Sequence, residues 1–185
     1  NYDTDKFPLI NGIRYYSYVT HIPDDAFQNT PEPHPNIEGE FPNLIYIGKS
    51  AFNGFKGKIL LTNLNKLESI GENAFFQAGT DDSEVSIHEG NVLQTIGNDA
   101  FYNFEGKILL TNLNKLESIG QYAFSARVGE SNTENEVSIT ATNNALATID
   151  INAFMDFRGT ITLLNLNKLK TIGENAFAYA SHTDS

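Results

Sequence analysis

A six-residue phrase, Ile-x-x-x-Ala-Phe, recurs along nearly the whole chain and restricts its possible folds more than any other feature. Its seven copies begin at Ile22, Ile47, Ile70, Ile96, Ile119, Ile149 and Ile172. By subtraction, successive copies lie 25, 23, 26, 23, 30 and 23 residues apart. A period in the twenties is that of leucine-rich repeats and is shorter than that of the helical repeats. Each copy is therefore expected to form one coil of a solenoid.

A second pattern runs over the first, because units of 23 residues alternate with longer ones. The Ala-Phe pairs ending at Phe52, Phe101 and Phe154 are followed three residues later by a second Phe, and the other pairs are not. The segments 55–75 and 104–124 are nearly the same peptide, and 157–177 is a looser copy. This pattern indicates the duplication of a two-unit block.

One unit can be read physically from Lys58 to Phe75. Apolar residues two apart, Ile59 and Leu61, predict a strand, and later ones three apart predict a turning backbone that sends one side chain inward at each corner. Ala74-Phe75 is expected to form one short helical turn that packs its Phe into the core. No unit can bury its own apolar edge, but stacked units form a continuous core.

The pattern L-x-x-I-G-x-x-A-F, with a strand before each Leu, resembles the bacterial surface leucine-rich repeats of the BspA (Treponema pallidum) type. The resemblance covers about Ile13 to Phe177. It implies a right-handed leucine-rich-repeat solenoid of about seven repeats, with a parallel β-sheet on one face and short helical turns or loops on the other. It also implies export to the bacterial cell surface, adhesion-type or host-matrix binding, and no shared catalytic residues. The chain departs from the family in having no Cys after Ala-Phe, no Pro after the strand, and long inserts.

The repeats predict a single domain over residues 1–185. It divides into an N-terminal cap-like unit (1–27), the repeats (28–177) and a tail (178–185). Tyr15, Tyr16 and Tyr18 are expected to cover the first core layer, with an aromatic ligand-binding patch as the alternative. The chain opens NYDTDKF, without a signal peptide, so we expect a fragment of a longer protein. Because no polar capping unit follows Phe177, end-to-end self-association is also expected.

Side chains of the predicted sheet that point away from the core are the candidates for binding. Aligning the units by the motif gives three outward rows: Lys58, Glu84, Lys107, Glu136, Thr160; Leu60, Ser86, Leu109, Ser138, Thr162; and Thr62, His88, Thr111, Thr140, Leu164. The alternating charges of the first row could simply keep the sheet soluble and in register. Alternatively, the two leucines beside small hydroxyl residues form a strip on which a partner docks. The candidate binding face comprises Lys58, Leu60, Thr62, Ser86, His88, Lys107, Leu109, Thr111, Ser138, Thr140 and Thr162.

Charge and composition argue against several other functions. The formal net charge of −11 disfavours nucleic acid and anionic lipid as partners. No stretch of about 20 apolar residues could span a bilayer, and the chain has no cysteine. The four histidines, His21, His34, His88 and His182, lie in different units without the spacing of metal ligands. No metal or cofactor is expected.

Two acidic runs also have ordinary explanations. The run Asp81–Glu84 is read as a solvated loop, with a calcium site as the weaker alternative. Asp24-Asp25 is read as a cap for the turn before Phe27. No nucleophile elbow, phosphate-binding loop or zinc-protease motif is present, so an enzyme is not expected.

The sequence therefore predicts a non-catalytic, extracellular binding or adhesion module of a bacterial cell-surface protein. It would recognise a host or matrix protein or glycan through the exposed sheet face. The alternative is a structural spacer that holds another domain away from the cell. The polar insert from Ser125 to Glu136 is expected to project from the solenoid without contributing to folding.

Overall fold

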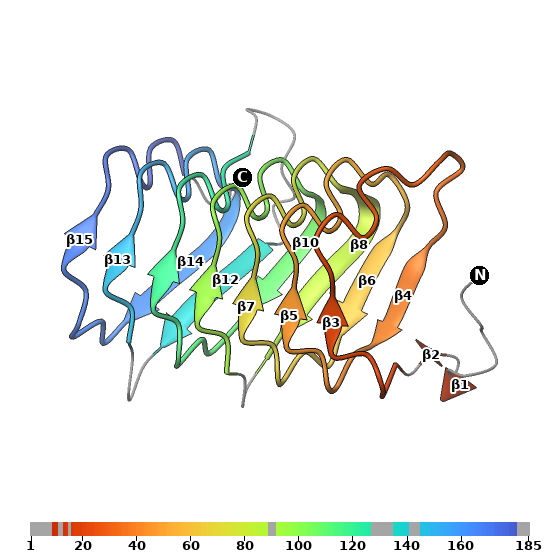
Figure 1. The fold of residues 1–185 in the computed structure, drawn as a ribbon. Helices are drawn as coiled ribbons and strands as arrows, with labels where there is room; N and C mark the ends of the chain where they lie inside the picture. Colours follow the sequence, from red (N-terminus) through yellow and green to blue (C-terminus); the bar gives the residue numbers. More distant parts are fainter. Residues whose placement is uncertain are drawn as a thin grey trace.

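The computed structural model describes residues 9–10, 13–14, 16–88, 92–126, 135–140 and 145–180. The chain winds through two parallel β-sheets that face each other across the core, and each coil passes once through each sheet (Figure 1). One sheet has six strands: β4 (Ile37–Glu40), β6 (Ile59–Thr62), β8 (Gly79–Ile87), β10 (Glu105–Leu110), β12 (Asn135–Thr140) and β14 (Gly159–Leu164). These strands are hydrogen-bonded in chain order, so the predicted solenoid with a parallel sheet is confirmed.

The second sheet replaces the turns and loops predicted for the opposite side of the solenoid. Its seven strands have two residues each: β3 (His21–Ile22), β5 (Tyr46–Ile47), β7 (Ser69–Ile70), β9 (Thr95–Ile96), β11 (Ser118–Ile119), β13 (Thr148–Ile149) and β15 (Thr171–Ile172). Each strand ends on the Ile that opens one copy of the repeated phrase. A separate antiparallel pair, β1 (Leu9–Ile10) and β2 (Ile13–Arg14), precedes both sheets.

The predicted helical turn at Ala-Phe is wrong, because the described residues contain no helix. The residue before each Ala-Phe has a positive φ, between 53° and 56°, at Asp25, Ser50, Asn73, Asp99, Tyr122, Asn152 and Asn175. A left-handed residue at this point prevents a right-handed helical turn from continuing. Six of the seven residues are Asn, Asp or Ser, and Asn and Asp tolerate this conformation best.

The turns are instead hydrogen-bonded from coil to coil. The Asn73 amide donates to the Asn98 carbonyl oxygen at 2.9 Å, and the Phe75 amide donates to the Ala100 carbonyl oxygen at 2.7 Å. Equivalent bonds join the other neighbouring turns. Buried backbone groups need partners, and here the next coil supplies them.

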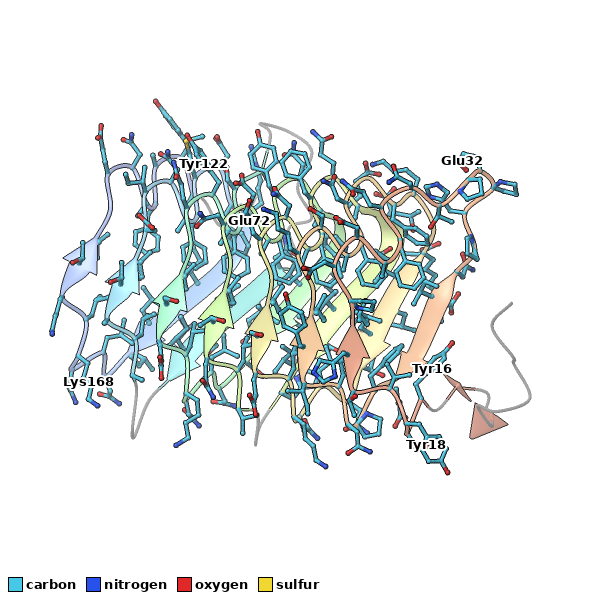
Figure 2. All side chains as sticks on the ribbon, viewed as in Figure 1. Tyr16, Tyr18, Glu32, Glu72, Tyr122 and Lys168 are labelled. Atoms are coloured by element: carbon cyan, nitrogen blue, oxygen red, sulfur yellow. The ribbon has the colours of Figure 1, made fainter. Side chains whose placement is uncertain are left out.

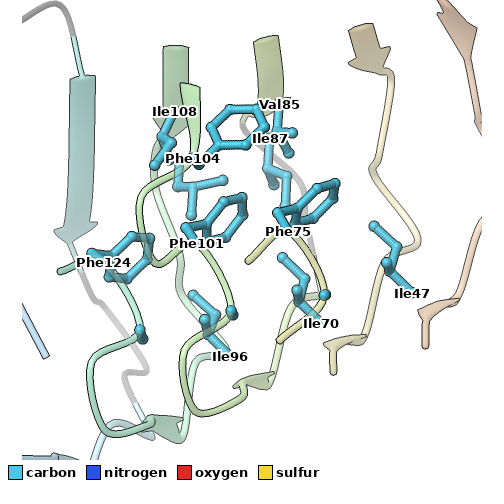
Figure 3. Packing of buried hydrophobic residues seen from close by; sticks show 14 of the residues in the cluster. Ile47, Ile70, Phe75, Val85, Ile87, Ile96, Phe101, Phe104, Ile108 and Phe124 are labelled. Carbon is cyan, nitrogen blue, oxygen red and sulfur yellow. The ribbon is translucent and has the colours of Figure 1, made fainter. Parts of the chain in front are cut away.

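Phenylalanine rings form a continuous stack through the core. Consecutive rings lie parallel, with centroids 4.8–5.5 Å apart, in the order Phe27, Phe52, Phe75, Phe101, Phe124, Phe154, Phe177. The second Phe of a two-unit block packs edge-on against two of these rings; Phe104, for example, contacts both Phe75 and Phe101 (Figure 3). Because one such ring contacts two coils, the physical repeat is the pair of coils that the sequence indicates.

The glycine of Ile-Gly-x-x-Ala-Phe is required by the close approach of consecutive coils. A Cβ atom on Gly97 would lie 2.6 Å from the Glu72 backbone nitrogen, closer than real Cβ contacts. Two copies of the phrase lack this glycine. In the first of these copies the position is held by Pro23, which follows β3, an edge strand of the seven-stranded sheet. In the other it is held by Asp150, whose amide donates a 3.0 Å hydrogen bond to the Ile119 carbonyl oxygen.

Two side chains cover the first coils. Tyr16 stacks on Phe41 with ring centroids 4.5 Å apart, which agrees with the covering role predicted for it. Tyr18 does not share this role, since it is 82% exposed, and Tyr15 lies outside the described residues. The ring of His34 stacks on Phe55 at 4.8 Å, so the proline-rich loop before β4 also packs on the core.

Candidate binding face

The outer face of the six-stranded sheet carries the predicted binding residues, but two of its registers differ from those predicted. Glu84 pairs with Lys107 as expected, whereas Leu60 takes the place predicted for Lys58 as the partner of Glu84. Likewise Leu109, and not Lys107, pairs with Glu136. The predicted ladder of alternating charge is therefore wrong, apart from its Glu84–Lys107 and Glu136–Thr160 steps.

A bulge in β8 accompanies the shifted pairing of β6 with β8. Gly79 pairs with Glu105 and Glu84 with Lys107, so β8 accommodates additional residues in a bulge between these two pairs. The Ser83 hydroxyl oxygen stabilises the bulge by accepting hydrogen bonds from the amides of Thr80, at 2.9 Å, and Ile59, at 3.0 Å. The acidic run predicted to be a loop is thus part of a strand. Its Asp81 and Asp82 side chains are exposed.

Five of the predicted residues, Ser86, His88, Lys107, Leu109 and Thr111, come together at the centre of the sheet, on β8 and β10 or at their ends. Ser86 pairs with Leu109, and the His88 Nδ1 and Thr111 Oγ1 atoms lie 3.4 Å apart at the end of the same two strands. The Glu84–Lys107 pair lies on the other side of Ser86 and Leu109. We call Glu84, Ser86, His88, Lys107, Leu109 and Thr111 the central patch. It combines one half-buried apolar side chain with charged and hydroxyl groups.

The other predicted residues lie further away or are less accessible. Leu60 is two strands from Leu109 and in a different row, so the two leucines do not form one strip. Lys58 Nζ lies 3.4 Å from Glu38 Oε2 and is engaged in this ion pair. Thr62 donates to the Gly39 carbonyl oxygen at 3.3 Å.

The predicted serines and the threonines of β12 and β14 differ in how accessible they are and in whether the structure describes their side chains. Ser86 and Ser138 are buried despite facing outward, so a ligand would reach their larger neighbours first. Ser138 pairs with Thr162 across β12 and β14. The side chain of Thr140 lies outside the described residues, as do His182 and most of the polar insert.

A second outward row, which the sequence-based prediction does not contain, lies on the seven-stranded sheet. The residues that precede the Ile of each repeated phrase pair from strand to strand in one line: His21, Tyr46, Ser69, Thr95, Ser118, Thr148, Thr171. The signal was present in the sequence, because five consecutive copies carry Ser or Thr before this Ile. Apolar residues three apart predict a bend in this segment, so they do not predict a strand here.

Polar clusters elsewhere are structural. Asp24 Oδ1 accepts hydrogen bonds from the Lys49 amide at 2.8 Å and the Tyr46 hydroxyl at 3.0 Å. Burial and the hydrogen bond to Asp24 raise the pKa of Tyr46 above its ordinary value of 10.0. Asp24 therefore caps the turn of the next coil, and the prediction that it caps its own turn is wrong. Within the described ranges, no three His, Asp or Glu side chains converge as metal ligands would.

Comparison with known proteins identifies the family. The model of the BspA type leucine rich repeat region matches residues 20–127 and 94–185, with six copies. The chain belongs to this family. BspA-type repeats are typical of surface proteins and are not typically catalytic. No curated protein and no solved structure matches the chain. In the described part of this BspA-type chain, no helix has the length and apolar character needed to cross a membrane.

Proposed function

We propose that this BspA-type chain is a non-catalytic binding module of a bacterial cell-surface protein, acting outside the cell. Its ligand would be a host or matrix protein or glycan, bound on the outer face of the six-stranded sheet. The observation that carries the proposal is the central patch, where Leu109 lies next to the Glu84–Lys107 pair and the His88–Thr111 contact. An apolar contact ringed by polar groups resembles the centre and rim of a binding interface.

The rigidity of the sheet supports this proposal. Val85, Ile87, Ile108 and Leu110 alternate with the residues of the central patch and are buried in the core. The patch side chains therefore stand on a backbone fixed by packing from below. A preorganised surface loses little conformational entropy when it binds, which favours affinity.

The test is a binding screen of the purified chain against matrix proteins, mucins and a glycan array. Leu109→Asp is the decisive variant, because it places an unpaired charge at the centre of the patch. Thr160→Asp adds the same charge at an exposed position of β14, on the edge of the same sheet, and serves as the matched control. We expect a saturable ligand whose affinity falls at least about tenfold in Leu109→Asp, the loss of about 1.4 kcal/mol, and changes less than twofold in Thr160→Asp.

A structural spacer is the second candidate function. The continuous Phe stack and the coil-to-coil hydrogen bonds favour it, because they make a stiff rod that could hold another domain at a distance. A spacer needs no ligand and tolerates Leu109→Asp as well as Thr160→Asp. A screen in which both variants and the parent chain bind nothing would support the spacer and contradict the binding module.

We also propose end-to-end self-association through the last coil. Leu164 is 51% exposed on β14 and Ile172 is 56% exposed on β15, and both strands lie at sheet edges. Exposed apolar side chains beside an edge strand favour pairing with another chain. Sedimentation of the 185-residue chain is expected to show concentration-dependent association that Ile172→Lys reduces. A monomer at all concentrations would contradict this contact.

A further inference from the structure

A surface cluster of aromatic rings lies on the turns, away from both sheet faces. Phe76 and Tyr102 stack with ring centroids 5.1 Å apart, and Tyr122 packs edge-on to Tyr102 at 6.3 Å. All three rings are half-buried, and they come from three successive coils. Tyr122 is visible on the edge of the solenoid formed by the turns, together with Glu72 (Figure 2). None of these rings belongs to the Phe stack of the core.

Acidic residues occupy the same row of turns as the rings, and the Tyr102 amide donates to the Asp99 carbonyl oxygen at 3.1 Å. Asp99 occupies the same turn position as Tyr122 in the preceding coil, and its amide donates to the Gln121 carbonyl oxygen at 2.8 Å. Glu72 interacts electrostatically with Asp99. Glu72 is engaged by Lys49, with the two charged groups 3.1 Å apart, whereas Asp99 has no ion pair among the described residues. We call Glu72, Phe76, Asp99, Tyr102 and Tyr122 the turn patch.

Tyr122 is retained at a conformational cost. Its φ is 53°, in the left-handed region where the equivalent residues of the other six turns are Asp, Ser or Asn. A bulky residue is uncommon in this region, and the strain is of order 1 kcal/mol. Asn would satisfy the backbone, so the backbone conformation does not account for the aromatic ring. An interaction made by the ring at the surface would account for it.

The charge of the turn patch determines which ligand suits it. Asp99 is disfavoured in its charged form by partial burial and by Glu72, so a cation placed between them would be stabilised. Aromatic faces also attract cations, and the guanidinium group of arginine binds both rings and carboxylates. A neutral sugar could stack on the rings and donate hydroxyl hydrogen bonds to Asp99, but it would not compensate the negative charges of Asp99 and Glu72.

We propose that the turn patch is a second binding site, which takes the lysine or arginine side chains of a basic segment of a partner protein. The cation packs against the Tyr102 and Tyr122 rings while Asp99 accepts its hydrogen bonds. This site lies on the turns and is independent of the ligand proposed for the sheet face. The net charge of −11 adds a general attraction that brings basic segments to the surface.

The test uses the intact chain and a blocked Gly-Arg-Gly-Arg-Gly peptide, with its Arg→Gln counterpart as the uncharged probe. Binding is followed by calorimetry at 0.15 M salt. Tyr102→Asn/Tyr122→Asn removes two rings without changing the net charge and introduces the residue found at the equivalent positions 53 and 73. Tyr179→Asn is the matched control, because Tyr179 is a left-handed turn residue that is 81% exposed outside the patch.

The double variant is expected to bind the arginine peptide about tenfold more weakly, within the range of cation–π contributions. Tyr179→Asn should stay within about twofold of the parent chain, and Asp99→Asn should weaken binding several-fold. The single variant Tyr122→Asn relieves backbone strain, so the urea midpoint of its unfolding should not fall. Weaker peptide binding by this variant would then be due to the lost ring and not to unfolding.

Two results would overturn the proposal. Equal peptide affinity for the double variant and the parent chain would mean that only diffuse attraction to an acidic surface is present. Loss of binding to a neutral oligosaccharide in the double variant, with no effect on the arginine peptide, would mean that the rings serve a glycan.

Discussion

The same six residues, Ile-Gly-Glu-Asn-Ala-Phe, occur in the middle of the solenoid at 70–75 and in the last described coil at 172–177. Their backbones make the same bond to the preceding coil, since the amides of Gly71 and Gly173 each donate to an Ile carbonyl oxygen at 2.8 Å. Their burial differs greatly, with Ile70 1% exposed and Ile172 56% exposed. The local sequence therefore sets the path of a coil, and the next coil sets how much of it is buried.

This comparison explains why a sheet face or a row of turns can act as a platform. A repeat solenoid gains stability mainly from contacts between neighbouring coils. The central patch and the turn patch both lie in coils with neighbours on each side, where the core is complete. Substitutions in the central coils should therefore cost more stability than the same substitutions in the last coil.

Truncating the isoleucine shared by the two segments should give the largest difference in stability between the central and the last coil. Ile70→Ala removes fully packed methyl groups and leaves a cavity, at a cost of about 3 kcal/mol. Ile172→Ala removes groups that are mostly in water, so it should cost less than about 1 kcal/mol. Urea unfolding of the two variants measures both values, and equal losses would contradict the role given to the following coil.

Replacing the glycine of the repeated phrase with alanine should give a smaller difference in stability between the central and the last coil. The new atom would lie 2.6 Å from backbone in Gly97→Ala and 2.4 Å from backbone in Gly173→Ala. The central coil is held on both sides, so Gly97→Ala should cost about 2 kcal/mol. The last coil can move outward, and Gly173→Ala should cost about half as much in thermal unfolding. A larger loss at Gly173 would show that the last coil is as constrained as the central one.

Two buried serines allow the effect of a hydrogen bond between coils on stability to be distinguished from the effect of burying a hydroxyl group. Ser83 Oγ accepts from the Ile59 amide of the preceding coil, whereas the buried hydroxyl of Ser125 has no hydrogen-bond partner in the described structure. Ser83→Ala should therefore destabilise the chain by about 1–2 kcal/mol, and Ser125→Ala should stabilise it by about 1 kcal/mol. Denaturant midpoints of the two variants shifting in the same direction would refute this distinction.

The smallest effect is expected at Asp99 and depends on pH. Burial and the nearby Glu72 raise the pKa of Asp99 above its ordinary 3.8, so the folded chain binds this proton more tightly than the unfolded chain. Stability then falls as the pH rises through the interval above 3.8. Because the carboxyl group is largely solvated, Asp99→Asn should stabilise the chain at pH 7 by less than about 0.5 kcal/mol. The gain should vanish near pH 3, and a gain that persists there would exclude this cause.

The sequence was sufficient to predict the solenoid, the parallel sheet and the inward side chains, because Ile59, Leu61 and Phe75 follow a period that only stacked coils can bury. It was not sufficient for the registers of the outer face. The β6–β8 register accompanies a bulge at β8, where Ser83 bonds to another coil, and the β10–β12 register accompanies a bond from the Ile108 amide to Asn135 Oδ1; no local pattern shows such bonds. The second sheet was missed because two-residue strands are too short for a period to be seen.

The binding residues could be placed only in part for the same reason. Leu60 and Leu109 alternate correctly with core residues, yet the row to which each belongs depends on the neighbouring strand. The turn patch could not be found from the repeat, because Tyr122 and Phe76 occupy different positions of the repeated unit and meet only through Tyr102.

Amide hydrogen exchange at Gly71 and Gly173 tests the central claim most directly, because the two amides share sequence, bond length and acceptor type and differ in the coil that follows. We expect Gly71 to exchange only through global unfolding and Gly173 to exchange through local opening, on the order of 100-fold faster. Equal protection of the two amides would contradict the claim that neighbouring coils, and not the coil itself, hold this fold together.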